Sequence, residues 1–259
     1  MPWHATMLSA SASFSSAPVP LLSYRSMQTG YVLEISVESV EAAMAAERGG
    51  AQRIEFCSNA RQGGTTPSDE LLSAVRARVT LPILSMVRPR GGTFLYTDGE
   101  FVTMQREIEA AKKFRMDGIV LGLLGANGHI DVERSAQLVE QARPLLVTYH
   151  RAFDECSDLQ KSLEDVIKTG AARLLTSGGK RTAPEALELL GDLVRIAGHR
   201  LIVMPGSGLH AGNILETVKK TGAREFHAGL SSLVPDPLNN LGAFEGEVRK
   251  LRAALTSND

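Results

Sequence analysis

The feature that most constrains the fold of this chain is a two-part unit that recurs along it. Each unit has a short run of mainly apolar residues, followed by a longer stretch with helical patterning and its own stop signal. Short apolar runs of this kind are typical of buried strands in parallel sheets. The expected strands are residues 32–37, 53–57, 82–87, 118–121, 145–150, 173–176, 201–204 and 225–227.

Strands that alternate with helices predict right-handed βαβ units and a parallel sheet. Helices are expected in the intervening stretches, including one at residues 184–197 and one at residues 211–221. A count of eight strands at this length favours a closed barrel over an open, doubly wound sheet. No strand is followed directly by a GxGxxG fingerprint, which weighs against a dinucleotide-binding fold. We therefore predict an α/β fold, a single (β/α)8 TIM-type barrel with parallel strands and surrounding helices.

The N-terminal segment differs in composition from the rest of the chain. Residues 1–28 are rich in serine and include Arg25, whereas the first acidic residue is Glu34. Disordered tails and organellar targeting peptides share this composition. Because there is one arginine and no clear amphipathic repeat, a disordered extension is favoured, with targeting as the alternative. Residues 29–259 are expected to form the barrel domain.

Charge and cysteine content exclude several classes of function. Lys and Arg number 28 against 29 Asp and Glu, which gives a formal charge of -1. Nothing in this balance indicates a surface for nucleic acid or for an anionic membrane. Every apolar stretch is strand-sized, so no membrane span is expected. The two cysteines, Cys57 and Cys156, form no CxxC pair and indicate a reducing compartment.

The alternation of side chains predicts a barrel interior that is more polar than folding requires. Because helices cover the outside of a barrel, the apolar side of each strand should face outward and the other side inward. The inward set is Glu34, Ser36, Glu38, Arg53, Glu55, Cys57, Leu84, Met86, Arg88, Thr148 and His150. Two interpretations stay open for the lower layer of Glu34, Arg53 and Glu55. It is a site, or it is a buried ion-pair network that only stabilises the barrel.

The segment LLVTYHRAFD carries reactive groups at a strand end. An imidazole, a guanidinium and a carboxylate, from His150, Arg151 and Asp154, follow the apolar run directly. The structural alternative is that His150 is a core histidine whose hydrogen bonds are all made within the protein, and that Arg151 and Asp154 form a local ion pair. The functional interpretation is acid-base catalysis on a small phosphorylated or carboxylated substrate. Its candidate catalytic residues are His150 as acid or base, Asp154 or Glu34 as the orienting carboxylate, Arg88 as the clamp on developing charge, and His227 as a second acid.

Glycine-rich loops follow several of the expected strands. Such loops bring backbone N–H groups close to a ligand, and barrels often bind phosphate behind the seventh and eighth strands. Arginine side chains beside them could hold an anion with two hydrogen bonds. Tight βα turns, which also use glycine, are the alternative. Besides Arg88, the candidate ligand-binding residues are Arg90, Ser177, Gly178, Gly206, Ser207 and Gly208.

These segments together resemble one known family. The stretches VLEISVESVEAAMAAERGGAQRIEFCSNARQGGTTPS, MVRPRGGTFLYTD, DGIVLGLLGANGHID, TYHRAFD, LLTSGG, VMPGSG and EFHAG are similar, in unbroken order over residues 31–230, to the copper homeostasis protein CutC family. The resemblance implies a TIM barrel, a cytoplasmic location, a homo-oligomer and a role in copper handling through monovalent copper. Whether the chain is also an enzyme stays open.

The resemblance also implies a metal site. Some members of the family have a proposed copper site made by a cysteine pair at the ends of the first two strands. Here the second position is Cys57, which becomes the metal-ligand candidate, and the first is Ser36. A hydroxyl is a hard ligand, whereas monovalent copper prefers thiolate and thioether sulfur. Met86 and Met204 are possible soft donors, although a strand methionine is more often core filler.

Overall fold

A computed structural model describes residues 30–257 of the chain. The expected extension at residues 1–28 therefore lies outside the described residues. The eight strands are β1 (Val32–Val37), β2 (Arg53–Phe56), β3 (Ile83–Met86), β4 (Gly118–Leu121), β5 (Leu146–Tyr149), β6 (Arg173–Thr176), β7 (Ile202–Pro205) and β8 (Glu225–Ala228). The described α-helices are α2 (Val40–Gly49), α3 (Asp69–Arg78), α4 (Asp98–Lys113), α5 (Val132–Ala142), α6 (Leu159–Thr169), α7 (Leu187–Ala197), α8 (Ile214–Thr221) and α9 (Leu241–Thr256).

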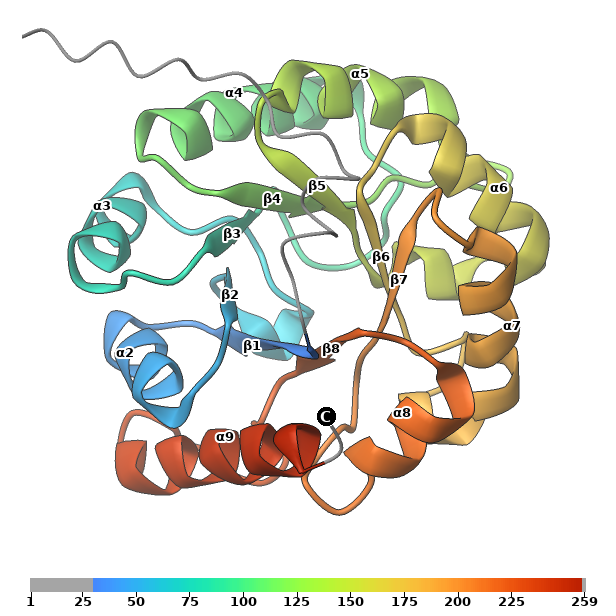
Figure 1. The fold of residues 1–259 in the computed structure, drawn as a ribbon. Helices are drawn as coiled ribbons and strands as arrows, with labels where there is room; N and C mark the ends of the chain where they lie inside the picture. The colour runs from blue at the N-terminus through green and yellow to red at the C-terminus, as the bar shows by residue number, and fades with distance from the viewer. Residues whose placement is uncertain (1–29, 258–259) are drawn as a thin grey trace, which may run out of the picture.

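All eight strands form one parallel sheet that curls into a barrel. The strand order is β7-β6-β5-β4-β3-β2-β1-β8, and a parallel bridge between Gly206 and His227 joins the two remaining edges. Figure 1 shows the strands at the centre and the helices around them, with α9 beside both α2 and α8. The prediction of a (β/α)8 barrel is confirmed.

Local sequence explains where most helices begin. The side chains of Ser39, Ser68, Asp131 and Asp158 each accept a hydrogen bond from a backbone N–H of the first turn of α2, α3, α5 and α6. Thr97 and the N3 glutamate of α4 bind each other's backbone N–H reciprocally, which is a capping box. These caps satisfy donors that have no partner inside the helix.

Two helices begin later than the sequence pattern predicts. The stretch expected to be helical from residue 184 begins as a 3-10 turn, Ala183–Ala186, and becomes α-helical only at Leu187. The helix expected from residue 211 begins at Ile214. There, His210 accepts from the N–H of Gly212, and the Asn213 side chain accepts from the N–H of His210. Side-chain bonds of this kind stabilise a turn in place of helix.

The predicted parity is confirmed for the strand residues of β1 and β2, whereas Glu38, predicted to face inward, lies past the end of β1 and is exposed. The outward residues of β1 and β2, such as Leu33, Ile35 and Ile54, are buried against the helices in one large apolar cluster. A separate small cluster lies inside the barrel and contains Cys57, Leu84, Met86 and Val120. Within residues 30–257, no helix is long and apolar enough to cross a membrane.

Candidate functional site

The lower barrel interior holds a buried charge network. Arg53 on β2 pairs with Glu34 on β1 and donates to Glu225 on β8 over 2.6 Å. Arg173 on β6 donates to the same Glu225 oxygen over 2.8 Å. Burial alone would raise the pKa of Glu34, but Arg53 and His227 outweigh it and hold the pKa at about 2. Buried charges are tolerated when paired in this way, so the network connects four strands and keeps Glu34 ionised.

Above this network, His227 lies between two carboxylates. Its Nδ1 is 2.8 Å from Oε1 of Glu34, and its Nε2 is 4.0 Å from Oε1 of Glu55. Burial lowers the pKa of His227, but Glu55 and Glu34 more than compensate, and the pKa is raised. Burial, with Glu34 nearby, raises the pKa of Glu55 as well. The two carboxylates therefore favour the charged form of the His227 imidazole.

Sulfur and hydroxyl groups occupy the next layer toward the carboxyl ends of β1 to β3. The Sγ of Cys57 lies 3.8 Å from Oγ of Ser36, which also donates to Glu55 over 2.9 Å. Met86 packs in the same small cluster as Cys57, and both contact the position where Gly64 would carry a Cβ. Burial, followed by the charge of Glu55, raises the pKa of the Cys57 thiol to about 12. The free thiol is thus protonated at neutral pH.

These layers open into a hollow of about 400 Å³ at the carboxyl ends of the strands. Its inner wall is formed by strand-end side chains and its rim by loop residues. The inner wall includes Ser36, Glu55, Cys57, Met86, His150 and His227. The rim includes Arg151, Arg181, Thr182, Ser207, Gly208 and Ser231. Groups from distant segments therefore share one cavity at the end of the barrel where barrel enzymes place their chemistry.

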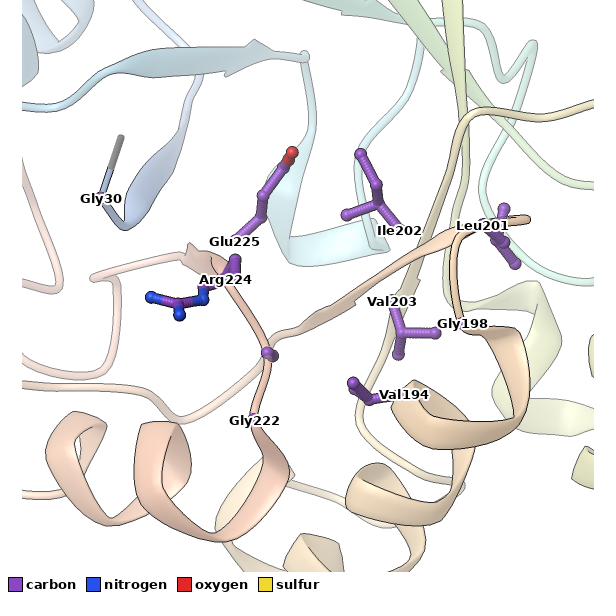
Figure 2. Close-up of a pocket in the computed structure, with 10 residues that line it drawn as sticks. Gly30, Val194, Gly198, Leu201, Ile202, Val203, Gly222, Arg224 and Glu225 are labelled. Atoms are coloured by element: carbon purple, nitrogen blue, oxygen red, sulfur yellow. The ribbon is translucent and has the colours of Figure 1, made fainter. Parts of the chain in front are cut away.

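A larger cavity, of about 570 Å³, lies at the opposite end of the barrel. Figure 2 shows its lining, which comes from the amino ends of β7 and β8 and from the end of α7. Its two charged residues have partners: Arg224 stacks over the Tyr31 ring and Glu225 accepts from Arg53 and Arg173. Size alone does not make a site, and the mouth of the barrel is the better candidate because it gathers reactive side chains.

His150 reaches the hollow from the end of β5. Its Nδ1 accepts a hydrogen bond of 3.2 Å from the backbone N–H of Ala152, and its ring lies 4.9 Å from that of Phe94. Its Nε2 is buried without a hydrogen-bond partner among the described residues. Burial, followed by the charge of Arg88, lowers the pKa of His150 to about 3. His150 is therefore a neutral donor toward the hollow at physiological pH.

Two arginines proposed as anion ligands are engaged by the protein itself. The guanidinium of Arg88 donates to the carbonyls of Gln62, Gly64 and Gly92 and lies over the Phe94 ring. Arg90 pairs with Glu100 of the α4 capping box. Neither is among the residues lining the hollow. The structure therefore places both arginines where they connect loops, and it places Arg151 and Arg181 at the rim instead.

Asp154 binds the loop after β6. Its carboxylate accepts from Arg151 over 2.8 Å, from the Thr176 hydroxyl over 2.5 Å and from the Ser177 N–H over 3.0 Å. Within residues 30–257, no hydrogen bond joins Asp154 or Glu34 to His150. Glu34 instead orients His227. The catalytic roles of these residues stay predictions.

The glycine loops contribute unequally to the hollow. Ser177 is buried and its hydroxyl bonds to Asp154, whereas Gly178 donates to the Thr176 hydroxyl. Gly206 lies at the barrel closure, where a Cβ would stand 2.4 Å from Leu175 and 3.1 Å from Cβ of His227. Only Ser207 and Gly208 of this predicted set line the hollow, both with positive φ, 76° and 71°.

Some residues of the hollow were not predicted as ligands. Glu55 carried a usable signal, because it lies two residues before Cys57 on the same face of the chain. Met86, which the sequence indicated as a possible soft donor, also lines the hollow. Arg181 and Thr182 lie in the loop after β6. No periodicity exists in such a loop, so nothing in the sequence indicated that they reach the rim.

Fold and site together define a class of protein: a (β/α)8 barrel with a charged interior and a mixed sulfur, carboxylate and imidazole wall at its mouth. The model of the CutC family matches residues 31–232. A family protein CutC of Chromobacterium violaceum is 47% identical over 197 residues, which are 76% of this chain and 80% of that protein. The Copper homeostasis protein cutC homolog of Mus musculus is 46% identical over 203 residues, 78% of this chain and 75% of that protein.

A solved structure agrees with these matches. The copper homeostasis protein CutC from Streptococcus agalactiae superposes with a TM-score of 0.72 at 31% identity, covering 76% of this chain and 98% of the other. The chain belongs to the CutC family. The resemblance inferred from the sequence motifs is thereby confirmed.

Proposed function

We propose that this protein takes part in copper homeostasis by binding monovalent copper at the barrel mouth. The observation that carries the proposal is the pairing of a thiol and a thioether, from Cys57 and Met86, in one buried cluster on the wall of the hollow. Thiolate and thioether are soft donors, which suit monovalent copper. The names of the mouse and human relatives, copper homeostasis protein cutC homologs, support the same role.

Copper binding at this site must release a proton. The ligand is the thiolate, and the pKa of the Cys57 thiol is about 12 because the side chain is buried and lies near Glu55. Copper therefore has to displace the thiol proton, and binding should tighten as pH rises. Met86 needs no deprotonation.

Competition with a chelator tests the proposal. The purified chain is titrated with monovalent copper under reducing conditions, with Cys57→Ala, Met86→Leu and Cys156→Ala as variants. We expect Cys57→Ala to weaken binding at least about tenfold, or about 1.4 kcal/mol, and Met86→Leu to weaken it less. Cys156→Ala is the matched control, because Cys156 is also buried but does not line the hollow. Equal affinity in all four proteins would refute the copper site.

A second function, acid-base chemistry on a small phosphorylated or carboxylated substrate, is favoured by a different observation. Glu55 Oε2 and His150 Nε2 are buried in the hollow wall without hydrogen-bond partners among the described residues. His227, oriented by Glu34, would exchange protons with the substrate, and the neutral His150 would donate to a substrate oxygen. Arg181, whose side chain is 87% exposed at the rim, would attract an anionic group.

A thermal stability screen tests this second function. A ligand that binds only the folded state raises the melting temperature, so phosphorylated and carboxylated compounds are compared with inorganic phosphate. We expect a shift that is reduced in Arg181→Ala and unchanged in Arg195→Ala, whose arginine lies on α7 outside the hollow. Absence of a shift with every anion would remove this candidate function.

We also propose a cytoplasmic location and a homo-oligomer, as the family resemblance implies. The even charge balance and the two unpaired cysteines support the reducing cytoplasm. Light scattering coupled to gel filtration would give the number of subunits directly. A mass equal to one chain would contradict the homo-oligomer.

A further inference from the structure

Three side chains of ligand type converge at the level below Cys57. Glu34, Glu55 and His227 come from the neighbouring strands β1, β2 and β8, and all three are buried. One potential ligand atom from each lies within 4.8 Å of the other two. Carboxylate oxygen and imidazole nitrogen are donors that divalent transition metals accept.

The hydrogen bonds divide these three residues into two roles. One oxygen of Glu34 binds Arg53 and the other binds Nδ1 of His227. Glu34 therefore fixes the imidazole ring, with the Nε2 side turned toward Glu55 at 4.0 Å. Metal-bound histidines commonly have a carboxylate on the opposite ring nitrogen in this manner. Two metal–ligand bonds of about 2.0–2.2 Å each can span such a gap.

Separate observations support a ligand at this wall. Oε2 of Glu55 is buried without a partner among residues 30–257, and so is Nε2 of His150 on the other side of the hollow. Buried polar atoms without a partner are rare, because each loses its bonds to water. The interior also gathers three carboxylates, Glu34, Glu55 and Glu225, with the guanidiniums of Arg53 and Arg173 and the imidazole of His227, and a divalent cation would take the place of the imidazole proton.

We propose that Glu55 and His227 bind a divalent cation of the zinc or cobalt type, with Glu34 as the positioning residue. This site is separate from the proposed copper site. Its nitrogen and oxygen donors suit a borderline or hard divalent ion, whereas the sulfur atoms of Cys57 and Met86 suit monovalent copper. The hollow above leaves room for water or a substrate atom to complete the coordination.

Cobalt titration of the full-length, metal-free chain tests the proposal, because Co²⁺ is visible by optical absorption and zinc can displace it. We expect saturable binding of one ion per chain. Glu55→Gln should weaken it at least about tenfold, and Glu34→Gln about 10–100-fold, as found for residues that orient a metal ligand. Glu107→Gln is the matched control, since Glu107 is a half-buried glutamate of α4 that does not line the hollow.

The same variants separate this site from the copper site. Cys57→Ala should keep cobalt and lose monovalent copper, whereas Glu55→Gln should do the reverse. No saturable cobalt binding by the wild-type chain, or equal binding by Glu55→Gln and Glu107→Gln, would overturn the proposal. Circular dichroism checks that each variant folds. If Glu55→Gln does not fold, Glu55→Asp is tested in its place, because it moves the carboxylate while keeping its charge. Cobalt binding by Glu55→Asp equal to that of Glu107→Gln would then overturn the proposal.

Discussion

At the scale of single residues, the candidate site residues differ in whether the protein already provides their hydrogen-bond partners. The guanidinium of Arg88 donates to backbone carbonyls of a neighbouring loop. The carboxylate of Asp154 accepts hydrogen bonds from Thr176 and Ser177. Nε2 of His150 and Oε2 of Glu55 have no such bonds among the described residues. A residue whose bonds are already made is suited to hold loops in place. A residue with an unused buried atom is suited to meet a ligand.

Restoring the first cysteine of the family pair should strengthen copper binding. In Ser36→Cys, the new sulfur would lie near Cys57, because Oγ of Ser36 is now 3.8 Å from its Sγ. Two thiolates are a better ligand set for monovalent copper than one thiolate and a hydroxyl. We expect at least about tenfold tighter binding, or about 1.4 kcal/mol, in the chelator competition. An affinity equal to that of the wild type would show that Cys57 is not a ligand.

Glu107 should destabilise the protein above neutral pH. Its burial on α4 raises its pKa from 4.5 to about 7, and only the Thr66 hydroxyl opposes this. The folded state binds the proton more tightly than the unfolded state, so the cost appears as pH rises from 4.5 toward 7 and is complete above 7. Glu107→Gln should therefore raise the free energy of unfolding by about 1–3 kcal/mol at pH 8. Urea denaturation at pH 4.5 should show little difference, and an equal gain at both values would exclude this cause.

At the scale of elements, sequence patterns predicted what depends on neighbours along the chain. The strands of residues 118–121 and 173–176 were located correctly, because apolar runs and the stop signals beside them are local. The contact between His227 and Glu34 joins residues that are 193 positions apart. It depends on how β8 closes against β1, and it could not be predicted from local patterns. The same holds for Arg88, whose partners are backbone carbonyls that have no sequence signature.

Gly118 should be required for the pairing of β4 with both neighbours. A Cβ there would lie 2.6 Å from the carbonyl oxygen of Leu146 on β5 and 2.9 Å from the Leu84 side chain on β3. Since a strand backbone cannot move aside easily, we expect Gly118→Ala to lower the free energy of unfolding by about 1–3 kcal/mol. Gly246→Ala is the control, because Gly246 lies inside α9 with nothing within 4 Å of the new atom.

That control should change stability in the opposite direction. Alanine inside a helix is favoured over glycine by about 0.5–1 kcal/mol, so Gly246→Ala should be slightly stabilising. Urea denaturation of both variants checks the pair. No loss of stability in Gly118→Ala would mean that the barrel tolerates a side chain at this position.

At the scale of the whole molecule, the barrel is held by an outer apolar layer and an inner charged one. The outer layer lies between strands and helices. It stabilises the fold roughly in proportion to the apolar surface that it removes from water. The inner network connects β1, β2, β6 and β8 through Arg53, Arg173, Glu34 and Glu225. Because the network includes β8, one of the two edge strands that the bridge between Gly206 and His227 joins, it links barrel closure to the position of His227. We therefore expect the geometry of the hollow to depend on the inner network.

Removing Arg53 should destabilise the entire barrel. Its side chain is 2% exposed and its guanidinium pairs with both Glu34 and Glu225, so Arg53→Met leaves buried carboxylates without a full partner. Breaking a buried pair from one side costs about 3–5 kcal/mol. The matched change on the surface, Arg200→Met, breaks an ion pair with Glu164 whose side chains are 41% and 43% exposed, and should cost under about 1 kcal/mol. Urea denaturation compares the two variants at neutral pH, where Glu34 is ionised because its pKa is about 2. Comparable losses would mean that the charged interior does not hold the barrel closed, and that Glu34 and His227 are positioned by the apolar layer alone.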